Sequence, residues 1–324
     1  MKTSFIALAV LFFVACSFSA NGNDTPSIMK TFKIKDAGEL VVKTSGGSIK
    51  VEGSNSGEVE VNAYVRKNGT LVKPESKELE EILKGFDLLI EKQGNSVHAI
   101  VRRVEQGMPW KRVSISFHVK TPKEISCDLK TSGGSINIAQ LEGSQMLKTS
   151  GGSLKINNVN GRVDGRTSGG SIKVNNQQGP ADLHTSGGSI SVSNSDGDVI
   201  ARTSGGSIRL ENIAGSMNAS TSGGSIKING TADKVKASTS GGGINVNVSE
   251  LSEALELRTS GGSINASIPD NLGLDLDLRA GRVNAPVKNF TGEAKKNRVS
   301  GSMNGGGIPV TMTTSGGSIN VDFQ

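Results

Sequence analysis

The chain has 324 residues, of which 43 are glycine and 3% are aromatic, with a single Trp and a single Tyr. Enzymes of this length normally build their cores and pockets from many more large side chains, so the composition argues against an ordinary enzyme. The net charge of +6 is too small for this length to indicate a nucleic-acid-binding protein. Two cysteines, Cys16 and Cys127, cannot form a framework of disulfides.

The first residues have the features of an export signal. An apolar stretch, Phe5–Val14, follows a positive charge and is too short to span a membrane. Ser17-Phe18-Ser19 suits ordinary signal cleavage, whereas Phe13-Val14-Ala15-Cys16 resembles a bacterial lipobox, in which the cysteine is lipidated after cleavage. We therefore expect a signal peptide over residues 1–19, with lipoprotein-type cleavage before Cys16 as the alternative. The exported protein would be lipid-anchored at the outer membrane or cell surface, or would lie in the periplasm.

A repeat dominates the chain after residue 127. The string TSGGS, or a near copy, begins every eighteen residues, with a last step of twenty, at Thr131, Thr149, Thr167, Thr185, Thr203, Thr221, Thr239 and Thr259. Further copies begin at Thr44 and Thr314. Self-similarity at a fixed period indicates a repeat architecture, in which each coil packs on its neighbours.

Hydrophobic residues alternate within each repeat. The fifth and seventh residues after the threonine are aliphatic, as at Ile208 and Leu210, and the second and fourth residues before it are mostly small or aliphatic. This period of two predicts two strands per coil, each with one buried face. The Gly-Gly pair would form one turn through positive φ angles, and Asn-rich segments that end in Gly would form the other. We expect the threonine to face inward and Asn158, Asn176, Asn194 and Asn212 to stack as a ladder of amides.

These patterns predict an all-β fold, a single-stranded right-handed parallel β-helix or solenoid with 18-residue coils. Residues 28–126 would form the first coil and a β-rich N-terminal cap with one short helix, near Glu75–Lys84. Residues 127–324 would form the solenoid of TSGGSI repeats. Near the C-terminus the repeat breaks, and Lys288–Asn304 has the character of a loop excursion.

The TSGGSI repeats, the early single copy, the β-rich insertion and the export signal together resemble the bacterial putative-adhesin family over about residues 31–324. That family is a β-strand-repeat domain of unknown function. The resemblance implies a right-handed parallel β-helix and an adhesin-like role, and it implies no catalytic motif.

Acidic residues, histidines and the second cysteine offer weak candidates for chemistry. Asp128, Asp164, Asp182 and Glu256 form one outward column, each two residues from a base, which is typical of solvated ion pairs. Asp275 and Asp277 form an isolated surface pair. The repeats lack the Asp that calcium-binding β-rolls place after their glycines, and the three histidines are scattered. Cys127 occupies an inward position. We therefore expect no enzyme, no metal and no cofactor.

A basic stripe is the sharpest functional candidate. Six residues after the threonine, an outward position holds no acidic residue in the eight regular copies and holds four cations. These residues are Lys155, Lys173, Arg209 and Lys227. The neighbouring basic column contains Lys130, Lys148, Arg166, Arg202 and Arg258, and much of its charge is offset by the acids two residues earlier. The stripe is uncompensated by acids. We interpret it as a site for an anionic polymer, such as an acidic polysaccharide or lipid headgroups; the alternative is a role in solubility and edge protection.

The sequence thus predicts a non-catalytic, adhesin-like surface-binding protein of the bacterial cell envelope. Its expected partner is an anionic polysaccharide or another cell-surface polymer, with the membrane as a second partner if Cys16 is modified, and no nucleic acid. Two alternatives remain at this point. The first is a structural or sensory envelope lipoprotein without adhesion, and the second is a polysaccharide-active β-helix enzyme.

Replacement of Cys16 tests the lipid anchor. If the thiol carries lipid, Cys16→Ser should move the protein from the membrane fraction to the soluble fraction, because the acyl chains supply the membrane affinity. Cell fractionation followed by immunoblotting measures the distribution. The same distribution for both forms would indicate ordinary signal cleavage instead.

Overall fold

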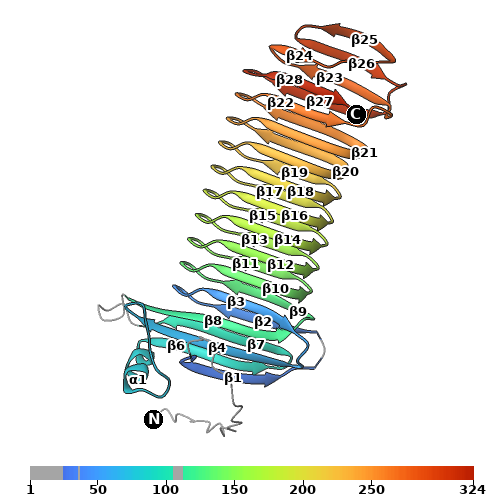
Figure 1. Cartoon of the computed structure of the whole chain (residues 1–324). Helices are drawn as coiled ribbons and strands as arrows, with labels where there is room; N and C mark the ends of the chain where they lie inside the picture. The colour runs from blue at the N-terminus through green and yellow to red at the C-terminus, as the bar shows by residue number, and fades with distance from the viewer. Residues whose placement is uncertain (1–24, 36, 105–111) are drawn as a thin grey trace, which may run out of the picture.

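The computed structural model describes residues 25–35, 37–104 and 112–324, so Cys16 and the rest of the expected signal peptide lie outside the described residues. Within these ranges the chain forms 28 strands and one helix, and the strands join into one sheet. Figure 1 shows flat coils stacked from the blue N-terminal end to the red C-terminal end. The prediction of an all-β, solenoid-like fold with one short helix is confirmed.

Each regular coil contains a seven-residue strand, a short turn, a four-residue strand and the TSGGS turn. The strand β12, Leu154–Asn160, pairs in parallel with β10, Ile136–Glu142, and with β14, Ile172–Gln178. Equivalent positions of successive coils therefore lie beside one another at the strand spacing of about 4.8 Å. The other strands of this region are β9 (Ile125–Lys130), β11 (Gln145–Lys148), β13 (Val163–Arg166), β15 (Ala181–His184), β16 (Ile190–Asp196), β17 (Val199–Arg202), β18 (Ile208–Ala214), β19 (Met217–Ser220), β20 (Ile226–Thr239), β21 (Ile244–Thr259) and β22 (Ile264–Ile268).

The coil has one more inward position than the alternation predicts. Asn158 has a φ of 52° and bends β12, so the alternation changes phase and Val159 is only 2% exposed. Asn enters this left-handed region more readily than most residues. The same position is buried in neighbouring coils at Leu141, Gln177, Ser195 and Ile213. The polar residues among them are satisfied, since Ser195 Oγ donates to Gln177 Oε1 at 2.8 Å.

The threonine of each TSGGS turn faces inward, as predicted. Thr149 is 2% exposed, and its hydroxyl donates to the carbonyl oxygen of Gly134 in the preceding coil at 2.8 Å. The same hydroxyl accepts the N–H of Gly152 at 3.3 Å. Both bonds recur at Thr131, Thr167, Thr185, Thr203, Thr221, Thr239, Thr259 and Thr314. One side chain thus ties each turn both to itself and to the coil before it.

The glycines of the TSGGS turn serve a different purpose from the one expected. Their φ angles are not positive; the positive values belong to the glycines of the opposite turn, such as Gly161 at 128°. A Cβ on Gly152 would lie 2.0 Å from the carbonyl oxygen of Gly134, whereas a Cβ on Gly151 would lie 3.5 Å from that of Gly133. The second glycine is therefore required because the stacked turns approach too closely for any side chain.

The N-terminal end of the stack is closed by a cap in which the spatial order of the strands differs from their order in the sequence. The first coil, β2 and β3, lies between β9 and β10 on one side and β7 and β8 on the other. Antiparallel strands β4, β1 and β6 complete the cap, and α1 packs beside them (Figure 1). The bounds are β1 (Ile28–Lys33), β2 (Gly38–Lys43), β3 (Ile49–Ser54), β4 (Glu58–Lys67), β5 (Thr70–Leu71), α1 (Lys77–Lys84), β6 (Phe86–Gln93), β7 (Ser96–Arg103) and β8 (Val113–Pro122). The helix begins two residues later than expected because Ser76 caps it by accepting the N–H of Leu79 at 3.2 Å.

The C-terminal end uses the same device. The last strands of the chain, β27 (Ile308–Thr314) and β28 (Ser318–Phe323), insert between β21 and β22 on one side and β23 (Leu274–Arg279) and β24 (Arg282–Asn284) on the other. The expectation of a loop at Lys288–Asn304 is wrong. That segment contains β25 (Phe290–Lys295) and β26 (Arg298–Met303), an antiparallel hairpin that pairs with β23. No helix in the described ranges is long and apolar enough to cross a membrane.

Two adjacent glycines test the stacking constraint. A Cβ on Gly188 would lie 2.1 Å from the carbonyl oxygen of Gly170, but a Cβ on Gly187 would make an ordinary contact at 3.5 Å. We expect Gly188→Ala to lower the free energy of unfolding by about 1–3 kcal/mol. Gly187→Ala should leave it unchanged or raise it by up to about 1 kcal/mol, because alanine restricts the unfolded chain. Urea denaturation measures both, and equal midpoints would contradict the close approach.

Candidate functional site

The outer side of one stack of strands forms a continuous polar surface. The residues six and eight positions after each threonine point outward from this stack, and we call this surface the polar face. Parallel pairing brings the six-position residues into one column, which runs through Asn137, Lys155, Lys173, Ser191, Arg209, Lys227, Asn245, Asn265 and Asn320. The register of the sheet thus converts a sequence spacing of eighteen residues into a row of neighbouring side chains.

The four cations of the predicted stripe all lie exposed in this column. Lys155 and Lys173 are direct neighbours, Arg209 and Lys227 are direct neighbours, and Ser191 separates the two pairs. Among the described residues, Lys155 and Lys173 make no ion pair. Their charges therefore stay available to a partner that approaches the polar face.

The expectation that the whole stripe is uncompensated is wrong. Glu211 lies two residues beyond Arg209 on the same face, and its carboxylate contacts Arg209 Nη1 at 3.1 Å and Lys227 Nζ at 3.5 Å. The hydrogen bond from Arg209 is the main cause that holds the pKa of Glu211 below its usual value. Glu211 is thus ionised at neutral pH and offsets part of the charge of both cations. Alternation within the strand would have revealed this neighbour.

Two members of the column escaped the sequence analysis. Lys50 stands six residues after Thr44 and pairs with Asn137 in the sheet, and its ammonium contacts Glu52 at 2.7 Å. Asn320 stands six residues after Thr314. Counting six positions from the outlying copies of the repeat would have found both.

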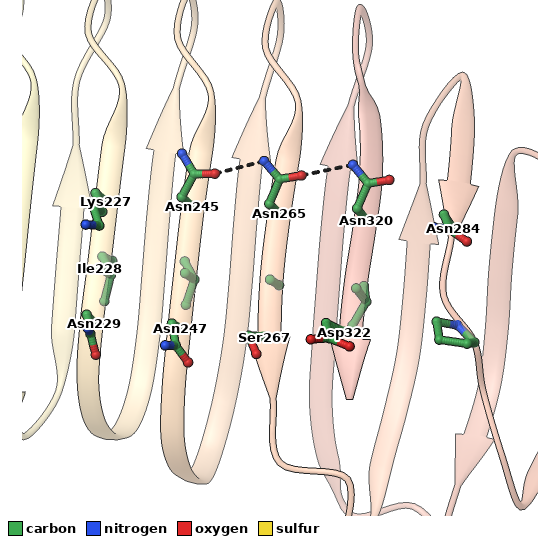
Figure 2. A pocket seen from close by; sticks show the side chains of 14 residues that line it. Lys227, Ile228, Asn229, Asn245, Asn247, Asn265, Ser267, Asn284, Asn320 and Asp322 are labelled. Atoms are coloured by element: carbon green, nitrogen blue, oxygen red, sulfur yellow. Dashed lines mark hydrogen bonds between the residues drawn. The ribbon is translucent and has the colours of Figure 1, made fainter. Parts of the chain in front are cut away.

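Beyond Lys227 the polar face becomes a groove lined by amides. Asn265 Nδ2 donates to Asn245 Oδ1 at 2.8 Å, and Asn320 Nδ2 donates to Asn265 Oδ1 at 2.9 Å, as Figure 2 shows. The groove has a volume of about 560 Å³. We call it the amide groove; its lining includes Lys227, Asn245, Asn265, Asn320, Asn284 and Pro286, together with the carboxylate of Asp322.

The predicted amide ladder lies at the corner of the coils and lines another groove, of about 760 Å³. Asn176 Nδ2 donates to Asn158 Oδ1 at 2.9 Å, and Asn212 Nδ2 donates to Asn194 Oδ1 at 3.1 Å. The ladder is interrupted between these pairs, because Asn194 Nδ2 donates to Asn175 Oδ1 instead, at 3.2 Å. Two carboxylates, Glu142 and Asp196, line this groove with one cation, Lys123, whereas the amide groove has one charged residue of each sign, Asp322 and Lys227.

The outward acidic column forms ion pairs, as expected. Arg166 contacts Asp164 at 2.9 Å and Asp182 at 3.3 Å, and Arg202 contacts Asp182 at 3.4 Å. Such exposed pairs contribute little to stability. Their carboxylates are engaged by guanidinium groups, which does not favour a glycosidase pair.

The isolated acidic pair is engaged in the same way. Asp277 contacts Arg279 at 2.8 Å. Asp275 accepts a hydrogen bond from Ser302 Oγ at 2.6 Å and one from the N–H of Gly307 at 3.0 Å. The Ser302 bond is the main cause that holds the pKa of Asp275 below its usual value. A general acid in sugar cleavage needs the opposite shift.

Thiol and metal chemistry find no support in the described parts of the chain. Cys127 is a free cysteine that is 4% exposed, and burial raises the pKa of its thiol. The expected inward position of Cys127 is confirmed, and a buried thiol with a raised pKa is a poor nucleophile at neutral pH. Residues 25–35, 37–104 and 112–324 contain no group of His, Cys, Asp or Glu side chains that could hold a metal ion.

Several solved structures resemble this chain at low sequence identity. A putative adhesin from Parabacteroides merdae ATCC 43184 is 13% identical with a TM-score of 0.43, over 91% of this chain and 95% of the other. A putative lipid binding protein from Parabacteroides distasonis ATCC 8503 is 16% identical with a TM-score of 0.40, over 91% and 96%. A putative adhesin from Bacteroides fragilis NCTC 9343 is 15% identical with a TM-score of 0.36, over 91% and 96%. Likeness at this level does not bear on function.

The family match concerns the C-terminal part of the chain. No curated protein matches the chain. The family model of Toastrack DUF4097 matches residues 183–322, a span that holds the amide groove and the stripe residues Arg209 and Lys227. The family resemblance expected from the TSGGSI repeats is thus confirmed over this span. Residues 183–322 are similar to the Toastrack DUF4097 domain, a β-repeat domain of unknown function.

Proposed function

We propose that this protein is an exported, non-catalytic and adhesin-like surface-binding protein of the cell envelope, which contacts an anionic polymer through the polar face. The observation that carries the proposal is the column of exposed cations, in which Lys155 and Lys173 are neighbours without an ion-pair partner among the described residues. A lipid anchor at Cys16 would hold the protein at the membrane and leave the coils free to reach a partner.

The spacing of the column supports a polymeric partner. Neighbouring coils lie about 4.8 Å apart, so adjacent cations fall within the Debye length of about 10 Å at 0.1 M salt and act together. The strands hold these side chains at fixed intervals, and a preorganised row lowers the ordering cost of binding. A linear chain with repeated negative charges matches this arrangement better than a small anion does.

The non-catalytic part of the proposal is supported by the carboxylates. The acidic residues that come nearest to a catalytic pair contact arginines or a serine, and the pKa of Asp275 is lowered. A structural or sensory lipoprotein without adhesion is the second candidate, and it would leave polymer binding unaffected by changes in the stripe.

We also infer that the coils wind as a right-handed parallel β-helix with eighteen residues per turn. The repeated offset of eighteen residues supports the coil length, for example between Ile136 and its partner Leu154. The handedness follows from the strong preference of crossover connections between parallel strands.

Neutralisation of the two unpaired lysines tests the stripe. The double variant Lys155→Gln/Lys173→Gln should elute from heparin resin at lower salt, with about 2- to 30-fold weaker binding, since each exposed ion pair contributes about 0.2–1 kcal/mol. The control is Arg166→Gln/Arg202→Gln, which removes the same net charge from cations that already have carboxylate partners. Equal elution shifts for the two double variants would mean that net charge alone governs retention.

Removal of the compensating acid tests the same face in the opposite direction. Glu211→Gln frees Arg209 and Lys227 from their shared carboxylate, so this variant should stay on heparin to higher salt than the parent protein. Glu256→Gln is the matched control, because Glu256 contacts Lys236 at 3.1 Å and Arg258 at 3.0 Å outside the polar face. If Glu256→Gln raises retention as much as Glu211→Gln does, the polar face has no special role.

A further inference from the structure

We infer that the amide groove is a subsite for the hydroxyl-bearing sugar rings of an acidic polysaccharide whose charged groups lie along the stripe. The charged part of this inference rests on the function proposed above. The inference names the class of ligand and adds a recognition element that electrostatic attraction does not supply.

The groove continues the stripe without a break. Lys227 ends the run of cations, lines the groove and pairs in the sheet with Asn245, and the column then runs through Asn265 to Asn320. Asn284 is the sheet partner of Asn320 and lies at the far end of the groove (Figure 2). A polymer that follows the long axis of the stack would pass from charges to amides at a constant repeat of about 4.8 Å.

The amides are arranged to bind hydroxyl groups. The hydrogen bonds from Asn265 to Asn245 and from Asn320 to Asn265 run in one direction. Asn265 and Asn320 therefore each keep a second amide N–H that these two bonds do not use. Within the described chain, Asn245 Nδ2 at one end and Asn320 Oδ1 at the other have no hydrogen-bond partner, and neither does the amide of Asn284. Sugar hydroxyls both donate and accept hydrogen bonds, as primary amides do. Hydrogen bonds in a chain polarise one another, which strengthens the free ends.

The end of the groove adds an apolar surface. Pro286 is exposed and lines the groove beside Asn284. A pyranose ring has an apolar C–H face and a rim of hydroxyls, so the proline ring and the row of amides match its two kinds of surface. The groove owes this end to the segment after β24, which closes the stack at the C-terminal end.

A membrane surface fits the polar face less well. Peripheral binding to lipid is strengthened by apolar side chains that enter the bilayer, in addition to electrostatic attraction to anionic headgroups. The large exposed hydrophobic residues in the described chain are Met29, Val104 and Met146, and none of them lies on the polar face. An extended peptide is also disfavoured over most of the groove, because strand addition needs a free sheet edge, and β20, β21, β22 and β28 are each paired on both sides.

Three probes and two double variants test the inference. Polygalacturonate carries carboxylates and sugar hydroxyls, polyphosphate carries charge without sugar rings, and phosphatidylglycerol vesicles present anionic lipid. We expect Asn265→Leu/Asn320→Leu to weaken polygalacturonate binding about tenfold by calorimetry and to leave polyphosphate binding unchanged. Lys155→Gln/Lys173→Gln should weaken both. The control for the groove variant is Asn137→Leu/Asn157→Leu, which makes the same change on the polar face outside the groove, and all variants are checked by thermal melting.

The outcomes separate the two proposals. If the groove variant binds polygalacturonate like the parent or like its control, or loses polyphosphate equally, the sugar subsite is overturned and the stripe is judged by its own variant. A parent protein that binds polyphosphate or the vesicles but not polygalacturonate also overturns the subsite alone. If the stripe variant binds both polymers like the parent, the proposed function fails, and a selective loss in the groove variant would still support a sugar site.

Discussion

The close stacking of the TSGGS turns is the constraint on which the rest of the structure depends. A Cβ on the second glycine would come within 2.0 Å of the carbonyl oxygen of the glycine one coil earlier, as at Gly152 and Gly134. The inward threonine bonds to that same carbonyl oxygen at 2.8 Å and fixes the turn in place. This contact opposes a slip of one coil against the next. A slip of one residue would expose the aliphatic core and bury the charged face, so the register between coils is strongly specified.

A fixed register turns a one-dimensional pattern into a surface. Each outward position becomes a column, and its chemical character changes only when the residue in one coil changes. The column therefore changes from basic residues to asparagines between Lys227 and Asn245, while the strand pairing continues unchanged. One acid, Glu211, is enough to divide the stripe into a free half and a compensated half. In the proposed function, binding strength on such a face would arise from many weak contacts at a regular spacing rather than from one deep pocket.

The ends of the stack require a different solution, because an open end presents rows of unpaired backbone groups that promote aggregation. Both ends place the terminal coil of the chain one layer inside and cover it with strands from elsewhere in the sequence. At the C-terminal end, this covering segment supplies Asn284 and Pro286, so the cap also completes the groove.

The features that depend on the local sequence pattern could be predicted, and those that depend on pairing between distant segments could not. The alternation, the period and the inward threonines follow from the sequence, because each depends on residues within one coil or on identical residues eighteen positions apart. The corner at Asn158, the reason for the second glycine and the hairpin at Phe290–Met303 do not follow. They depend on backbone angles and on contacts between coils that the period does not encode. The stripe could thus be found by counting, but the amide groove exists only because the tertiary structure brings the Asn284 segment against the last coil, where no repeat predicts it.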